Sequence, residues 1–266
     1  MIMETRRVAM KKQTIVLLLG VFVISLACQT LIPTSRDGTV ISACTDIVKA
    51  VSSIQPGSAP QTLLETGVKQ GGEFDVNDYF NVLTHLSMQD GYTLDYVYQV
   101  DGLGAYPILY ARPVDQPAYV STKDIPVGLE YSDYLSHITI ENVEQGYFEF
   151  VAMNIMAGQF YLDWHANYND TQIVCNRGDV NAIISDINAG DFGYKFDLAQ
   201  QTKARTMKNI EPIVQLTGDN ATVEVISFTK WGGFYRRTYT INLSFPHTII
   251  DVKEENLVPY DCGIMF

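Results

Sequence analysis

The densest group of polar side chains next to apolar stretches lies at residues 163–170. Asp163 and His165 are two positions apart, so on a strand their side chains would point to the same face. A carboxylate beside an imidazole can orient it as a general base, and both groups can also bind a metal ion. Asp170 adds a second acid, and these three residues are the candidates for a catalytic centre. In the alternative interpretation, the Asn and Asp residues form a turn and His165 ends a strand.

The rest of the sequence carries no established catalytic or metal-binding motif. It lacks the Gly-x-Ser-x-Gly, His-Glu-x-x-His and phosphate-loop patterns. The other three histidines, His85, His137 and His247, are isolated along the chain. The four cysteines have no metal-type spacing, so we predict neither a metal site nor a cofactor. A catalytic site assembled from distant residues stays open, because such sites are defined by geometry.

Aromatic residues offer a different chemistry, that of a binding surface. The chain has 16 tyrosines and 2 tryptophans. Five of the tyrosines cluster in one segment: Tyr92, Tyr96, Tyr98, Tyr106 and Tyr110. Exposed rings of this kind are suited to binding a carbohydrate or a peptide, because each has an apolar body and a polar tip. Tyrosine is equally common on half-buried strands, so an ordinary strand pair is the alternative.

These candidates have to be positioned by helices and strands, which the apolar spacing predicts. Helices are expected at residues 41–54, from an N-cap at Asp75 towards a stop at Gly91, at 142–157 as a buried central helix, and from Asp179 to Gly190. Hairpins are expected at 92–112 and 160–175, and a C-terminal meander at 223–245 with a third strand at 249–252. This order predicts an α+β fold in which antiparallel hairpins and a meander are interleaved with amphipathic helices.

Composition bounds the class of protein. The net charge is -12, which excludes nucleic acid as a partner. With 47% hydrophobic and 18% charged residues, the chain can bury a sizeable core and is not disordered. We predict a globular α+β domain at residues 41–266, with two lobes that divide near residues 190–209 as an alternative.

The N-terminal segment indicates export. Four basic residues in the first twelve are followed by an apolar run up to Ala27, which is typical of a signal segment at residues 1–27. The run ends Ser25-Leu26-Ala27-Cys28, which resembles the lipobox of bacterial lipoproteins over residues 10–28. The resemblance implies cleavage before Cys28, lipidation of Cys28 and attachment to a bacterial membrane. An ordinary cleaved signal peptide and an uncleaved anchor are the alternatives. Residues 28–40 are then expected to form a tether.

An exported chain can form disulfides, and three further cysteines are candidates: Cys44, Cys175 and Cys262. Cys262 is expected to pair with one of the other two, because a bridge would hold the C-terminal tail in place. The sequence does not choose between the two partners.

Together these features predict a lipid-anchored protein of the cell envelope with a non-catalytic binding or assembly role. Its partner would be the membrane, through the lipid anchor, and an envelope protein, a peptide or a glycan. The alternative is an extracytoplasmic hydrolase or metal-dependent enzyme centred on Asp163, His165 and Asp170.

Overall fold

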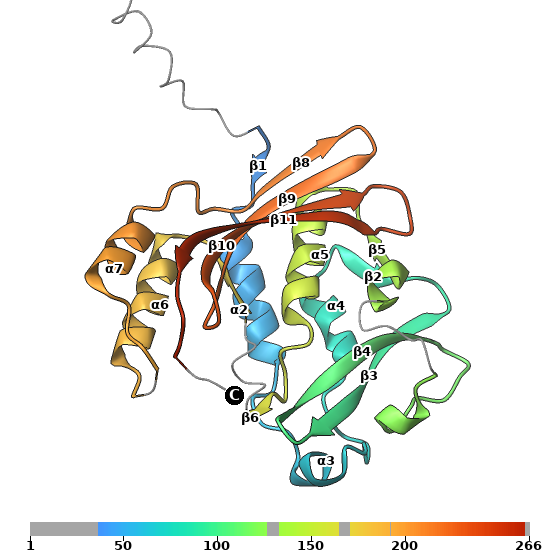
Figure 1. Ribbon diagram of the computed structural model, residues 1–266. Helices are drawn as coiled ribbons and strands as arrows, with labels where there is room; N and C mark the ends of the chain where they lie inside the picture. Colours follow the sequence, from blue (N-terminus) through green and yellow to red (C-terminus); the bar gives the residue numbers. More distant parts are fainter. Residues whose placement is uncertain (1–36, 127–132, 165–170, 192, 264–266) are drawn as a thin grey trace, which may run out of the picture. The chain divides into compact units, whose positions relative to one another are not determined.

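The computed structural model describes residues 37–126, 133–164, 171–191 and 193–263 (Figure 1). The chain divides into two units, Met1–Asp37 and Gly38–Phe266, and all described helices and strands lie in the second. The signal segment, Cys28 and most of the tether lie outside the described residues. Helices and antiparallel sheets are both prominent, and the predicted α+β class is confirmed.

The largest sheet has six antiparallel strands. Its order is β1-β8-β9-β10-β11, and β7 also pairs with β9. The strands are β1 (Thr39–Val40), β7 (Thr171–Val174), β8 (Ile213–Thr217), β9 (Asn220–Thr229), β10 (Gly233–Asn242) and β11 (Ile249–Pro259). The C-terminal meander is therefore confirmed, and its third strand continues beyond the predicted end at residue 252. A tight turn joins β9 to β10, which pair from Thr229↔Gly233 to Asn220↔Asn242.

Two smaller sheets accompany it. One pairs β2 (Leu86–Met88) with β5 (Ile138–Ile140), and the other contains β3 (Tyr92–Asp101), β4 (Gly104–Pro113) and β6 (Asp163–Trp164). The predicted hairpin at 92–112 is confirmed as β3 and β4. Its turn is fixed by the Asp101 carboxylate, which accepts hydrogen bonds from the backbone amides of Leu103 and Gly104.

The predicted hairpin at residues 160–175 is wrong. Its two segments do form strands, but β6 pairs with β4 and β7 pairs with β9 in the large sheet. Alternation within a segment predicts a strand, whereas the choice of partner depends on contacts that are distant in sequence.

Helices occur at α2 (Cys44–Ile54), α3 (Gln61–Thr66), α4 (Tyr79–Val82), α5 (Glu144–Met156), α6 (Arg177–Ala189) and α7 (Leu198–Arg205). Short 3-10 turns lie at η1 (Val76–Asp78), η2 (Thr122–Asp124) and η3 (Asp133–His137). The helix predicted from Asp75 is capped there as expected, but it ends at Val82 because Leu86 enters β2 opposite Ile140. Helix α6 begins before the predicted N-cap Asp179. Asn176 is the cap, and Asp179 completes a capping box with it.

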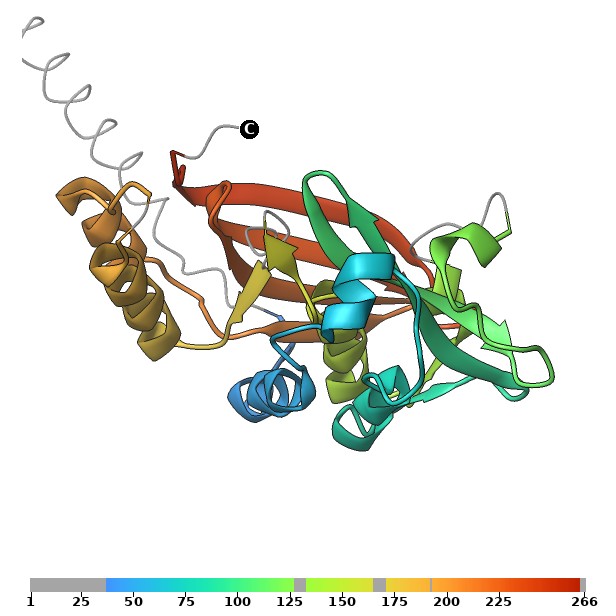
Figure 2. The same ribbon diagram turned by 90° about the horizontal axis from the view of Figure 1, so that it is seen from below.

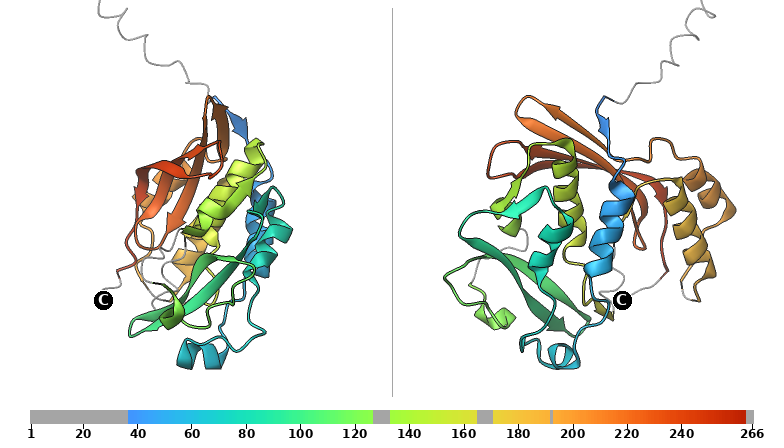
Figure 3. Two further views of the ribbon diagram at one scale, coloured as in Figure 1. Left: turned by 90° about the vertical axis from the view of Figure 1, so that its right-hand side faces the viewer. Right: turned by 180° about the vertical axis from the view of Figure 1, so that it is seen from behind.

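The apolar side chains form two clusters on opposite faces of the large sheet. Alternation along β9 sends Val223 and Val225 into the first cluster and Ile226 and Phe228 into the second. Helices α2 and α5 lie side by side in the first cluster (Figure 3), and α5 is buried on nearly all sides, as predicted. Helices α6 and α7 contribute to the second cluster and lie next to each other (Figure 2). This cluster combines residues from both sides of segment 190–209.

Candidate functional site

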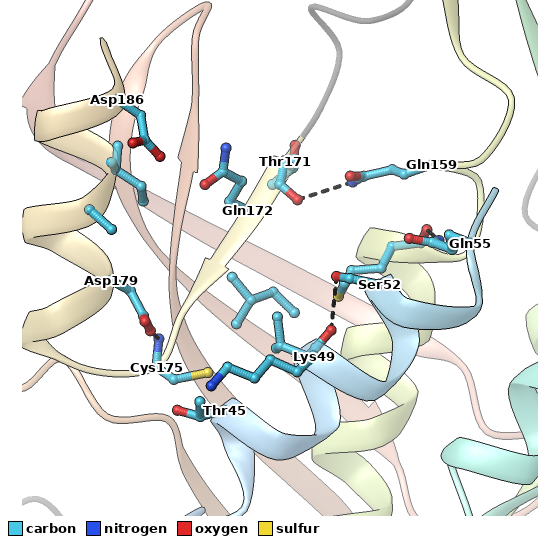
Figure 4. A pocket seen from close by; sticks show the side chains of 15 residues that line it. Thr45, Lys49, Ser52, Gln55, Gln159, Thr171, Gln172, Cys175, Asp179 and Asp186 are labelled. Carbon is cyan, nitrogen blue, oxygen red and sulfur yellow. Dashed lines mark hydrogen bonds between the residues drawn. The ribbon is translucent and has the colours of Figure 1, made fainter. Parts of the chain in front are cut away.

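A groove runs along one edge of β7, between α2 and α6 (Figure 4). Its volume is about 310 Å³. Helix α2 contributes Lys49 and Ser52 to one wall, and α6 contributes Ala182 and Asp186 to the other. The floor is β7 itself, so the groove follows the strand edge.

A disulfide closes one end of the groove. Cys44, the first residue of α2, is bonded to Cys175, which directly follows β7 and lies 131 residues further along the chain. The Cα atoms are 5.6 Å apart, and both residues are buried. The bridge therefore ties the α2 wall to the floor. Disulfides persist in oxidising compartments, so this one suggests a location outside the cytoplasm.

The predicted pairing of Cys262 is wrong. Cys262 is a free cysteine and is buried in the second cluster. The tail is held by other contacts: the Tyr260 hydroxyl donates to the carbonyl of Tyr194, and the amide of Tyr194 donates to the carbonyl of Cys262. These contacts order the chain end, so the argument that only a bridge could hold it does not apply.

The groove-facing edge of β7 is open. No strand among the described residues pairs with it, since β7 pairs only with β9. The Gln159 side chain donates to the carbonyl of Thr171 at 3.1 Å, and the amide of Cys175 donates to the Asp179 carboxylate at 2.8 Å. Backbone groups of alternate residues in an antiparallel strand point to the same side. The amide and carbonyl of Ile173 therefore face the groove, between these two side-chain contacts.

The two walls carry opposite charges. Lys49 is exposed on α2 and Asp186 is exposed on α6. Within the described part of the chain, neither side chain forms an ion pair. A bound segment would find a cation on one side and a carboxylate on the other.

A histidine–carboxylate pair lies elsewhere, and the sequence did not reveal it. Glu149 of α5 is only 1% exposed, and its Oε1 is 2.8 Å from Nδ1 of His85. Gln145 donates to the same oxygen at 2.9 Å. On the other side of the ring, Nε2 is 3.9 Å from a carboxylate oxygen of the exposed Glu141. A carboxylate on Nδ1 orients an imidazole as in general-base sites, but none of the described hydroxyl groups hydrogen-bonds to Nε2. Among the described side chains, none is therefore placed as a nucleophile for this pair.

His85 and Glu149 are 64 residues apart, so spacing could not connect them. One signal was present: a lone carboxylate within the apolar run of the helix predicted at 142–157. A buried charge needs a partner, and His85 supplies it.

The predicted catalytic residues are only partly described. His165 and Asp170 lie outside the described residues. Asp163 is exposed on β6, opposite Ala105 of β4. In the described residues, no group of three His, Cys, Asp or Glu side chains is placed to hold a metal ion.

Three of the five tyrosines do not form the exposed ring surface that the sequence predicted. Tyr96, Tyr98 and Tyr110 are 2%, 1% and 0% exposed, so they belong to the core. The Tyr98 hydroxyl donates to the carbonyl of Tyr161, and the Tyr110 hydroxyl accepts from the amide of Tyr119. Because α3 and the turns η1 and η3 pack against this hairpin, most of the ring area faces protein. The other two, Tyr92 and Tyr106, are half-buried.

None of the described helices has the length and apolar character of a membrane span. Comparison of the chain with protein-family models, with curated proteins and with solved structures finds no match. The absence of a recognisable domain family in the sequence agrees with this result.

Proposed function

We propose that the protein is an extracytoplasmic binding protein, attached to a bacterial membrane through a lipid on Cys28. The Cys44–Cys175 disulfide supports a location outside the cytoplasm. The anchor is supported by residues 10–28 of the sequence. Intact mass of the membrane-extracted protein tests it, and we expect an acylated Cys28 as the first residue. An unmodified Cys28 terminus, or retention of residues 1–27, would contradict the anchor.

The ligand in this proposal is an extended peptide segment that adds to β7 as a further strand. The open edge of β7 is the observation that carries it. An extended peptide offers the amide and carbonyl that the backbone of Ile173 needs as partners, and strand addition of this kind is a common mode of peptide recognition. A small molecule would have no comparable reason to follow a strand edge.

A disulfide and two hydrogen bonds hold the groove in shape. The Cys44–Cys175 bridge fixes the α2 wall, and the Asp179 carboxylate fixes the end of β7 through the amides of Cys175 and Asn176. A preformed site loses less conformational entropy on binding than a flexible one. Lys49 and Asp186 then favour a peptide with side chains of both charges.

The experiment selects short linear peptides from a random library on the exported full-length protein. Ala182 is exposed on the α6 wall, so Ala182→Trp fills the groove without touching the core. We expect this variant to lose binding of the selected peptides. Ala189→Trp, at the exposed end of the same helix and away from the groove, is the matched control and should retain it.

Methylation of the peptide backbone tests the mode of binding. Ile173 lies between the two side-chain contacts, so a methyl group on the one peptide amide that donates to its carbonyl should abolish binding. Methyl groups on the amides next to it in the peptide, which point to the opposite side, should be tolerated. Binding that survives Ala182→Trp, uniform tolerance of methylation, or failure to select any peptide would each refute strand addition at β7.

A further inference from the structure

A second cavity lies between residues 69–77 and strands β3 and β4. Its volume is about 500 Å³. Sites for small molecules usually measure roughly 300–1,000 Å³, so the cavity is large enough for one.

The lining contains one buried hydroxyl without a partner among the described residues. Tyr96 of β3 lines the cavity and is 2% exposed, and no described group forms a hydrogen bond with its hydroxyl. Buried polar groups are nearly always paired, so an exception calls for a group supplied from elsewhere. Burial raises the pKa of Tyr96, and Tyr161, Glu73 and Asp95 raise it further. The hydroxyl therefore keeps its proton and can donate.

Two cations next to Tyr96 have donors to spare. Lys69 Nζ lies 2.6 Å from Asp95 Oδ1 and 4.7 Å from the centre of the Tyr96 ring. Arg112 Nε lies 3.3 Å from Asp95 Oδ2, and its Nη1 donates to the carbonyls of Pro113 and Gln116. The Lys69 ammonium uses one of its three hydrogens for Asp95, which leaves two as donors. Nη2 of Arg112 has no hydrogen bond among the described residues. Both side chains are mostly buried, at 13% and 17% exposed.

The rim is a preformed turn. Gly71 and Gly72 have φ angles of 92° and 85°, in the left-handed region that favours glycine. The Glu73 carboxylate accepts hydrogen bonds from the amides of Gln70 and Gly71, which holds the turn in place. Open space surrounds both glycines, so a ligand can approach the backbone closely.

The charges around the cavity select the class of ligand. Its lining contains three acids, Glu73, Asp75 and Asp95, and two bases, Lys69 and Arg112. An anion would face the excess of carboxylates, and a cation would face Lys69 and Arg112. A neutral molecule with many hydroxyl groups can accept from Tyr96, Lys69 and Arg112 and donate to the carboxylates.

We propose that this cavity binds a neutral saccharide, with the Tyr96 hydroxyl, Lys69 and Arg112 as hydrogen-bond donors. Phe74 adds an aromatic ring to the lining, as saccharide sites often use. The site is separate from the β7 groove, so its failure and that of the peptide proposal are distinguishable.

The test uses the full-length protein and a panel of neutral hexoses and their disaccharides, with the matching uronic acids and amino sugars as charged analogues. Binding is measured by saturation-transfer NMR. We expect the neutral sugars to bind. Tyr96→Phe should lower their affinity about tenfold, which is the effect of one lost hydrogen bond at a buried site. Tyr92→Phe, on the same strand but outside the cavity lining, is the control and should bind like the wild type.

Tyr96→Phe removes only an unpartnered hydroxyl, so its thermal unfolding midpoint should equal or exceed that of the wild type. A clear loss of stability would show that the hydroxyl has a partner within the protein, which overturns the proposal. Binding of charged analogues only, binding unaffected by Tyr96→Phe, or no binding by any member of the panel would overturn it as well.

Discussion

Glu149 accepts hydrogen bonds from both the backbone amide and Nδ1 of His85, each at 2.8 Å. The carboxylate comes from the middle of the central helix α5, and His85 directly precedes β2. A single side chain therefore fastens the two-stranded sheet to the helix that forms the core. These contacts give the buried acid a structural role.

Replacing the Glu149 carboxylate should destabilise the folded protein. Glu149→Ala leaves the amide of His85 and the side chain of Gln145 without an acceptor and opens a cavity in the core. We expect the free energy of unfolding to fall by about 2–4 kcal/mol. Glu141→Ala is the control, because Glu141 is 64% exposed and contacts His85 only at 3.9 Å. It should change stability by less than about 0.5 kcal/mol, measured by urea unfolding. Equal effects of the two variants would refute the structural role of Glu149.

His247 should make stability depend on pH. Burial lowers the pKa of His247 below its ordinary value of 6.5, and the hydrogen bond to the carbonyl of Asn242 offsets this in part. The imidazole of the unfolded chain therefore binds a proton more readily than that of the folded protein. The free energy of unfolding should be highest above pH 6.5 and should fall as the pH drops from 6.5 towards the pKa of His247 in the folded protein. His247→Gln should flatten this part of a plot of unfolding free energy against pH. An unchanged slope in the variant would assign the effect to other groups.

The Cys44–Cys175 disulfide should contribute much more to the free energy of unfolding than the free thiol of Cys262. The bridge joins residues 131 positions apart and so lowers the conformational entropy of the unfolded chain. A cross-link over this distance raises the free energy of unfolding by about 3–5 kcal/mol. We expect reductant to lower the free energy of unfolding of the wild type and of Cys262→Ala by the same amount. The double variant Cys44→Ala, Cys175→Ala should not respond to reductant. Non-reducing peptide mapping should recover the Cys44 and Cys175 peptides joined, and a bridge to Cys262 would contradict the pairing.

Gly233 should not tolerate a side chain. Its φ angle is 94°, and an added Cβ would overlap the carbonyl oxygen of Val258 in the neighbouring β11. Gly233→Ala should therefore destabilise the protein by about 2–4 kcal/mol in thermal or urea unfolding. Gly57→Ala is the matched control, since nothing lies within 4 Å of its added Cβ and its φ is not positive. A similar effect of the two substitutions would mean that the turn between β9 and β10 adapts.

Elements that depend on their own sequence could be predicted. The hairpin of β3 and β4 and the meander of β9 and β10 join strands that follow one another, so alternation and turn residues suffice. Helix α5 was recognisable because apolar residues lie on most of its sides, which indicates a buried helix.

Elements that depend on distant partners could not be predicted. The segment at Leu86–Met88 has helical spacing up to Leu86, yet it becomes β2 because β5 offers it a strand to pair with. The groove depends on the same effect: β7 leaves its expected hairpin partner and joins β9, which opens its other edge between two helices. Nothing within residues 171–174 indicates that one edge of this strand is left unpaired.

The bond between Cys44 and Cys175 also decides what a protease can release. Every residue from α2 to β7 lies inside one covalent ring, including both small sheets and the exposed loop at residues 114–118. A cut in that loop leaves both pieces joined, so the nicked protein migrates as a single chain until the bridge is reduced. Segments beyond Cys175, among them α6, α7 and the meander, lie outside the ring. A cut there leaves two pieces without a covalent link, which migrate separately on a denaturing gel even without reductant. The part of the protein that forms the β7 floor of the groove and its α2 wall is thus protected as a covalent unit, while its α6 wall is not.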